Sequence, residues 1–234
     1  MELSKRVNNI SGTSSGNVVL ITGGSRVFGN GRRRDSDSER SAEIFLPDSP
    51  ETPCILPDLP RRYAGHTQDG GLLCGGLSSG TRTNCRQWNT EEGKFPIKPV
   101  HEFKNSIAWH VSWTSASKTY LFGGGFRYRY TPNKNSNSNI TIITPGIFDG
   151  APGLFNLTYP LYGACSIPDP EKDTVLITGG TYSKQTTSLY NVNGFVEYLS
   201  ELNHQRKYHG CTSYFANQKR VFFVFLKLLN VLMY

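Results

Sequence analysis

Two residue patterns in this chain have the form that nucleotide chemistry uses. The run Val18–Ser25 is apolar and ends beside a glycine pair, and glycines after a buried strand can cradle a pyrophosphate at a helix N-terminus. Tyr130 and Lys134 have the spacing of a catalytic tyrosine–lysine pair. The surroundings do not fit this chemistry, because Arg32–Arg40 lacks the apolar period of a helix and Tyr130 lies among Pro, Asn and Ser residues. We therefore predict that the chain is not an enzyme and has no catalytic residue.

Three histidines could offer imidazole ligands to a metal ion. His66, His110 and His209 each come just before a predicted strand, at the same point of a repeat described below. A feature that recurs with the repeat is most simply structural. We interpret these residues as turn histidines and predict no metal site and no cofactor.

The five cysteines show no C-x-x-C spacing, which disfavours a zinc ribbon. Cys74 and Cys85 flank the loop between two predicted antiparallel strands, a geometry that allows a disulfide. Cys165 and Cys211 occupy equivalent positions in adjacent repeats, and we expect them to be buried thiols that pack as small apolar groups. Cys54 is the fifth, and an odd number leaves at least one cysteine unpaired.

Three Asn-x-Ser/Thr sequons begin at Asn9, Asn139 and Asn156. Asn139 lies in a polar stretch and is the better glycosylation candidate, whereas Asn156 is expected inside a strand. The sequons weakly favour an extracellular origin with a longer N-terminus, because residues 1–16 lack the apolar core of a signal peptide. A cytoplasmic location is the alternative.

A sequence repeat predicts the strands that position these residues. The sequence Val-Leu-Ile-Thr-Gly-Gly occurs at 19–24 and at 175–180, and two weaker copies lie between them. A spacing of about 50 residues with one glycine pair per copy is typical of a β-propeller built from four-stranded blades. We expect the glycines to allow positive φ and close backbone approach near the crowded axis. They are Gly23, Gly24, Gly75, Gly76, Gly123, Gly124, Gly179 and Gly180.

Alternation and turn residues predict the strands of each blade. The first blade has Val18–Thr22, Ala42–Leu46 and Pro53–Leu59, and lacks an innermost strand because only polar residues precede Val18. The later blades are predicted at Gly65–Gln68, Gly71–Cys74, Asn84–Trp88 and Lys94–Phe103; Trp109–Ser115, Thr119–Phe122, Ile140–Ile143 and Gly153–Tyr159; Tyr162–Ile167, Thr174–Thr178, Thr187–Val192 and Phe195–Leu199; and Tyr208–Phe215 and Arg220–Phe225.

The glycine pairs and the segments before the innermost strands together resemble kelch repeats over residues 18–225. Segments such as Leu56–Pro60 and Gly163–Pro170 resemble a loosely characterised group of invertebrate kelch proteins, and the fold implied resembles the central domain of galactose oxidase. The resemblance implies an all-β, kelch-type β-propeller with four-stranded antiparallel blades. About four to five blades are present, so we expect an incomplete ring. Residues 1–17 are expected to be disordered and the apolar tail 226–234 to lie outside the fold, with a five-bladed ring closed by that tail as the alternative.

The formal net charge of +7 raises the question of a nucleic-acid partner. The basic residues are scattered, however, and the cluster Arg32–Arg34 is followed at once by Asp35, so we predict no nucleic-acid binding. The apolar C-terminal run Val221–Tyr234 is too short to span a bilayer and is interrupted by Lys227.

These properties favour a non-enzymatic scaffold that binds a protein partner through rim loops. The two long loops are Ser25–Arg40 and Gly125–Asn139, and the second carries aromatic and Arg residues of the kind that anchor protein interfaces. These residues are Phe126, Arg127, Tyr128, Arg129 and Tyr130. One alternative is an extracellular carbohydrate-active or copper-oxidase-like enzyme, because copper radical oxidases share the kelch propeller. Another is a fragment of a ubiquitin-ligase substrate adaptor. The partner's identity and the oligomeric state are left open.

Overall fold

The computed structural model describes residues 11–15, 18–24, 40–46, 49–60, 67–69, 71–76, 84–89, 91–103, 107–116, 118–125, 140–143, 151–152, 157, 159–169, 171–180, 185–206, 209–216 and 219–225. These residues form β-strands joined by turns. They contain no helix long and apolar enough to cross a membrane.

The strands form four antiparallel sheets of four strands each and one sheet of two strands, and in each sheet the strands pair in chain order. The first blade contains β1 (Ser11–Ser15), β2 (Val18–Thr22), β3 (Ala42–Leu46) and β4 (Ser49–Ile55). The second contains β5 (Thr67–Asp69), β6 (Leu72–Cys74), β7 (Asn84–Gln87) and β8 (His101–Glu102). The third contains β9 (Val111–Ser115), β10 (Lys118–Phe122), β11 (Ile140–Ile143) and β12 (Ala151–Pro152). The fourth contains β13 (Cys165–Asp169), β14 (Thr174–Thr178), β15 (Thr187–Asn191) and β16 (Gly194–Tyr198). The two-stranded sheet contains β17 (Gly210–Ala216) and β18 (Lys219–Phe225).

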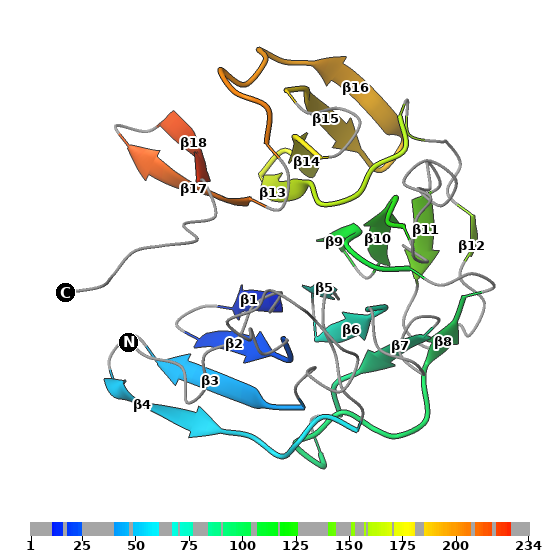
Figure 1. Cartoon of the computed structure of the whole chain (residues 1–234), viewed down its shortest axis with the longest axis vertical. Coiled ribbons are helices and arrows are strands. Elements are labelled where there is room, and N and C mark those ends of the chain that lie inside the picture. Colours follow the sequence, from blue (N-terminus) through cyan, green and yellow to red (C-terminus); the bar gives the residue numbers. More distant parts are fainter. Residues whose placement is uncertain are drawn as a thin grey trace, which may run out of the picture.

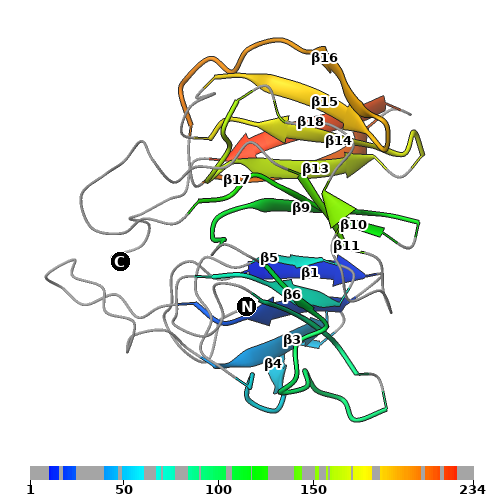
Figure 2. The same ribbon diagram turned by 90° about the vertical axis from the view of Figure 1, so that its right-hand side faces the viewer.

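The first strand of every sheet faces a common axis. Strands β1, β5, β9, β13 and β17 contact one another in this order, and the fourth strands β4, β8, β12 and β16 lie at the periphery (Figure 1). Turning the molecule shows the sheets stacked beside one another as blades (Figure 2). The all-β propeller with four-stranded antiparallel blades agrees with the fold predicted from the repeat.

One strand contradicts the sequence-based assignment. Residues Ser11–Ser15 form β1, which pairs with β2 in register from Ser11↔Thr22 to Ser15↔Val18. The first blade therefore has its innermost strand, and the prediction that residues 11–15 belong to a disordered segment was wrong. A strand held by backbone pairing needs no apolar alternation, so these polar residues gave no signal. The tail 226–234 lies outside the described residues.

The outer strands differ most from their predicted bounds. Strand β4 begins at Ser49, not Pro53, and β12 is the pair Ala151–Pro152, where a strand at Gly153–Tyr159 was expected. Within the described residues, each outer strand pairs with a neighbouring strand on one edge only. Their sequences are consequently less constrained than those of the second strands.

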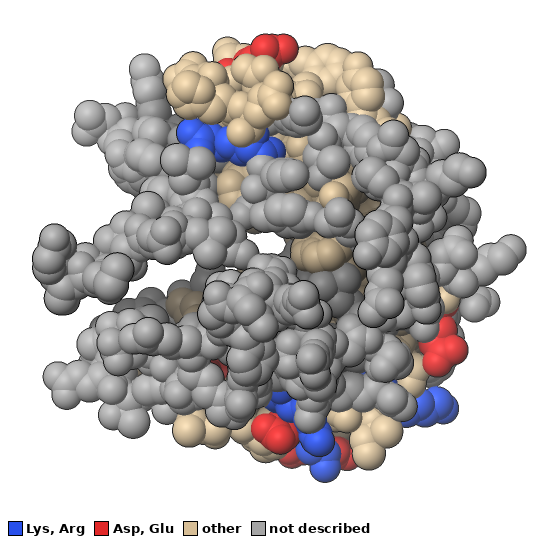
Figure 3. Space-filling view, viewed as in Figure 1, with Lys and Arg blue, Asp and Glu red and all other residues tan. Residues whose placement is uncertain are grey.

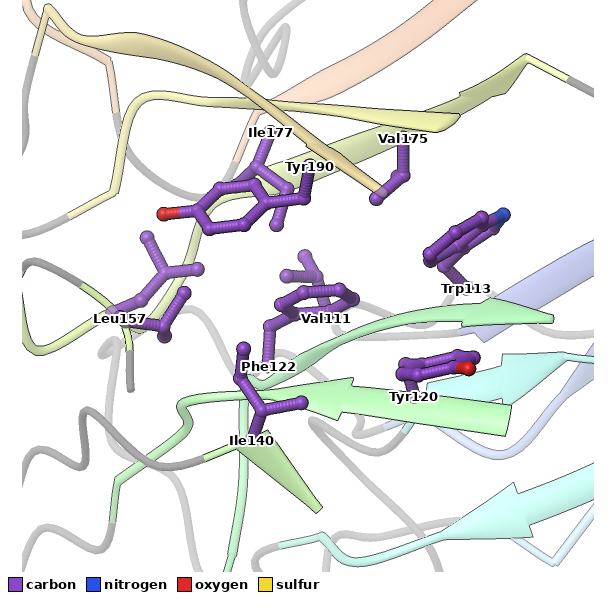
Figure 4. Packing of buried hydrophobic residues seen from close by; sticks show 10 residues of the cluster. Val111, Trp113, Tyr120, Phe122, Ile140, Leu157, Val175, Ile177 and Tyr190 are labelled. Carbon is purple, nitrogen blue, oxygen red and sulfur yellow. The ribbon is translucent and has the colours of Figure 1, made fainter. Parts of the chain in front are cut away.

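The hydrophobic core lies between blades. Its largest cluster joins the third and fourth blades, with Phe122 and Val175 fully buried and the rings of Trp113 and Tyr120 stacked at 5.0 Å between centroids (Figure 4). In the second blade, Leu73 packs toward the first blade while Leu72 and Cys74 pack toward the third. The second strands are apolar on both faces for this reason, and their sequences read as continuous apolar runs.

Candidate recognition rim

The glycine-pair end of each blade is hydrogen-bonded to the start of the next blade. The N–H of the second glycine donates to the backbone carbonyl of the residue four positions before the next innermost strand. These hydrogen bonds run from Gly76 to Ile107 (2.8 Å), from Gly124 to Leu161 (2.6 Å) and from Gly180 to Arg206 (2.9 Å). Because the same bond recurs at three successive joints, the glycine-pair ends lie on one rim of the propeller.

Glycine is required at these joints for two physical reasons. Each of the eight glycines has a φ between 61° and 125°, a region that other residues rarely adopt. A Cβ atom at Gly75 would also lie 2.5 Å from the Ile107 carbonyl oxygen, and one at Gly179 would lie 2.6 Å from the Arg206 carbonyl oxygen. The expectation of close approach is thus met, but the crowding comes from the following blade and not from the propeller axis.

Two of the three histidines lie inside these joints. The His209 ring packs against Gly179, and its Nε2 lies 3.3 Å from the Thr178 hydroxyl oxygen. Burial, helped by the charge of Arg206, lowers the pKa of His209 to about 4. His110 lies between Gly75 and Gly124, and burial lowers its pKa to about 3. Both rings are therefore neutral parts of the packing at pH 7. His66 lies outside the described residues.

The first long loop leaves and rejoins the fold on this rim. Gly23 donates its N–H to the Ser41 carbonyl at 2.8 Å, which brings the two ends of the loop together. At the returning end, the Arg40 Nε donates to the Leu59 carbonyl at 2.6 Å and lies 3.8 Å from an Asp58 carboxylate oxygen. Residues 25–39 lie outside the described part of the chain.

The second long loop begins and ends at the corresponding place of the third blade. Gly125 donates its N–H to the Ala108 carbonyl at 2.9 Å, and Phe122 pairs with Ile140 where the chain returns. The predicted anchor residues Phe126, Arg127, Tyr128, Arg129 and Tyr130 fall outside the described residues, as do the sequon residues Asn9, Asn139 and Asn156. The structure thus positions the ends of this loop.

The cysteines form two disulfides. Cys74 and Cys85 are direct cross-strand partners of β6 and β7 and are bonded to each other, as their predicted positions allowed. Cys165 and Cys211 are also bonded, across the innermost strands of the fourth and fifth sheets, with 6.0 Å between their Cα atoms. The prediction that these two are free buried thiols was therefore wrong. Neighbouring innermost strands lie within disulfide distance, which the sequence alone did not reveal. Cys54 is exposed and unpaired.

The face shown in Figure 3 has no single large group of basic side chains among the described residues. In the view of Figure 3, Lys and Arg side chains of this part of the chain occur in separate places, and those at the lower edge lie near Asp and Glu. Within the same residues, no group of three or more His, Cys, Asp or Glu side chains is placed to hold a metal ion.

Comparison with known proteins identifies the fold. No protein-family model and no curated protein matches the chain. The solved structure of YjhT, a β-propeller protein, matches with a TM-score of 0.71 over 95% of this chain and 73% of that one, at 12% sequence identity. This chain has the β-propeller fold. At such low identity the likeness to YjhT concerns the propeller architecture alone.

Sequence reasoning missed the role of the residues before each innermost strand. The three acceptors, Ile107, Leu161 and Arg206, are different residues, because the joint uses their carbonyl groups. The sequence spacing does indicate these acceptors. Each lies three residues before an equivalent position of its repeat, which is occupied by His110, Ala164 or His209. Aligning the repeats at that position identifies the acceptor.

Proposed function

We propose that this protein is a kelch-type, non-enzymatic scaffold whose glycine-pair rim presents loops to a protein partner. The observation that carries the proposal is the recurrence of one backbone joint, from the second glycine to the following blade, at three successive positions of the rim. Such joints fix the ends of each loop independently of its sequence. A rigid frame with variable loops is well suited to recognition.

Two features favour the second long loop as the principal contact. Its ends, Gly125 and Ile140, are buried and hydrogen-bonded to the frame, so the loop leaves from a fixed base. Its sequence, Phe126–Tyr130, alternates aromatic and Arg residues, which are the commonest anchors of protein interfaces. The kelch assignment is supported by the glycine pairs, their positive φ and the strand order within each blade.

The test is capture of partners by cross-linking from extracts of the source organism, followed by mass spectrometry. The triple variant Arg127→Ala/Tyr128→Ala/Arg129→Ala is expected to lose at least tenfold of the captured partner, with unchanged circular dichroism and thermal unfolding. The matched control is Arg32→Ala/Arg33→Ala/Arg34→Ala, which removes the same number of large side chains from the other long loop. Undiminished capture by the first variant would show that the second loop is not the contact.

A further inference from the structure

The outer strand of the fourth blade has an unusually apolar exposed surface. In β16 and the residue after it, Phe195, Val196, Tyr198 and Leu199 are between 38% and 45% exposed. Within the described residues β16 pairs only with β15, and it lies at the outer edge of the molecule in both ribbon views (Figures 1 and 2). Its second edge is therefore a row of backbone groups next to exposed apolar side chains.

The other outer strands carry features that oppose pairing with another strand. Strand β4 contains Pro50 and Pro53, and β12 ends in Pro152, and proline cannot donate a ladder hydrogen bond. Strand β8 has only two residues. Strand β16 has five residues and no proline, so it is the outer strand most open to an added strand.

The exposed aromatic rings of β16 are fixed by the core. Buried Phe122 contacts Tyr190, Tyr190 contacts Phe195 at 5.7 Å between ring centroids, and Phe195 contacts Tyr198 at 4.7 Å. The register shift between Leu189 and Tyr190 leaves Val196 as an extra residue, which puts Phe195 and Tyr198 on the same face of the sheet. Rings held in this way lose little conformational entropy when they bind.

The backbone of Tyr198 faces the open edge. Leu199 donates its N–H to the Thr187 carbonyl at 2.9 Å, so Leu199 is in a hydrogen-bonded pair with β15. Adjacent residues of an antiparallel strand alternate in this respect. The N–H and C=O of Tyr198 consequently point away from β15 and can receive a further strand.

The charges along β16 indicate which kind of partner can bind there. Glu197 and Glu201 are exposed, and residues 185–205 contain no Lys or Arg, although the whole chain has a formal net charge of +7. Two copies paired antiparallel through β16 would bring their Glu197 side chains close together, and like charges opposite each other on neighbouring strands are destabilising. The exposed surface of β16 instead complements an extended peptide segment that alternates apolar residues with Lys or Arg.

We infer that β16 is a second docking site, separate from the rim, which binds an extended basic and apolar peptide segment as an added strand. Backbone pairing at Tyr198 supplies the hydrogen bonds, Phe195 and Tyr198 supply the apolar contact, and the two glutamates select the charge. The loops of the rim play no part in this interaction.

Two synthetic peptides test the inference. The first is acetyl-Thr-Val-Lys-Phe-Lys-Thr-amide, in which lysines alternate with Val and Phe, and the second replaces both lysines with glutamate. We expect the basic peptide to bind at least tenfold more tightly at low salt, and to slow hydrogen exchange of the Tyr198 amide. Equal affinity of the two peptides, or binding without protection of Tyr198, would overturn the inference.

Variants with exposed substitutions locate the site without threatening the fold. Val196→Lys should weaken the basic peptide at least tenfold, whereas the matched control Ile55→Lys, at a 70% exposed residue of β4, should leave its affinity unchanged. Glu197→Lys/Glu201→Lys should reverse the charge preference. If Ile55→Lys has the same effect as Val196→Lys, or if the free protein dimerises through β16 at micromolar concentration, a basic peptide is not the occupant. A variant of β16 that loses peptide binding should still capture the partner of the rim loops, and a variant of the rim loops should still bind the peptide. These two results distinguish the β16 site from the proposed function of the rim.

Discussion

At the scale of single residues, the motif Thr-Gly-Gly performs several tasks within one turn of the chain. Thr178 is fully buried, with its hydroxyl oxygen 3.3 Å from His209 Nε2, Gly179 makes room for the same ring, and Gly180 donates to the Arg206 carbonyl. A single short motif thus holds the end of one blade and the start of the next. A substitution here should affect the joint between blades and leave the pairing within a blade intact.

Gly179→Ala tests whether close approach, and not only positive φ, requires glycine. Gly179 and Gly93 have nearly the same φ, 66° and 62°, but a Cβ at Gly93 meets no atom within 4 Å. We expect Gly93→Ala to cost about 1–2 kcal/mol of unfolding free energy from backbone strain. Gly179→Ala should cost a further ~1–3 kcal/mol from overpacking against the Arg206 carbonyl. Urea unfolding of the two variants measures the difference, and equal losses would contradict the role of close approach.

The buried histidines predict loss of stability in mild acid. The pKa of His209 falls from 6.5 to about 4 on folding and that of His110 from 6.5 to about 3. Below about pH 6.5 the unfolded chain takes up protons that the folded chain cannot, so the unfolding free energy falls as the pH falls toward these lower values. The stabilisation is complete above about pH 6.5.

Urea unfolding between pH 7.5 and pH 4.5 checks this expectation. His209→Gln should flatten the dependence of the unfolding free energy on pH, because it removes one of the two groups. His204→Gln is the matched control, since His204 is exposed. The expectation fails if the two variants have the same slope.

At the scale of elements, the sequence predicts a strand best where both of its faces are buried. Strand β14 (Thr174–Thr178) was predicted with its observed bounds, because Val175 packs toward the third blade in a continuous apolar run. Strand β1 was missed because Ser11–Ser15 is polar and gains its position from backbone pairing with β2. The ends of the rim loops could be predicted from the glycine pairs, whereas the exposed strip on β16 depends on a bulge and on exposure, which need coordinates.

We expect the two-stranded sheet to depend on its covalent link to the fourth blade. A hairpin of two strands is marginally stable by itself, and Cys165–Cys211 ties β17 to β13 across a sequence separation of 46 residues. Loop entropy gives this disulfide a contribution of about 4 kcal/mol, compared with about 3 kcal/mol for Cys74–Cys85, whose separation is 11 residues.

Hydrogen exchange of two double variants tests the dependence. In Cys165→Ala/Cys211→Ala, amides of β17 and β18 should exchange faster, while those of β6 and β7 keep their protection. In the matched variant Cys74→Ala/Cys85→Ala the increase should centre on the second blade. Uniform acceleration throughout the chain in both variants would show that the fold opens as a whole and not sheet by sheet.

At the scale of the whole molecule, the same three kinds of contact recur between neighbouring blades. The joints between the second and third blades and between the third and fourth blades each have an apolar cluster, a glycine-to-carbonyl hydrogen bond and contact between innermost strands. Stability in such arrays is approximately a sum of unit and nearest-neighbour terms. One disulfide cross-links two strands of the second blade, and the other links the fourth blade to the two-stranded sheet. Disulfides of this kind persist in an oxidising compartment.

The two disulfides predict which cysteines of the folded protein can react with an alkylating reagent. Of the five cysteines, we expect only Cys54 to react with iodoacetamide in the native, unreduced protein, and all five to react after reduction and denaturation. Intact-mass spectrometry counts the added groups directly. Reduction should also lower the thermal midpoint, because both cross-links restrict the unfolded chain. Three or more reactive thiols in unreduced protein purified from an oxidising compartment would contradict the paired state, whereas one reactive thiol would make that compartment the place to search for the partner of the rim.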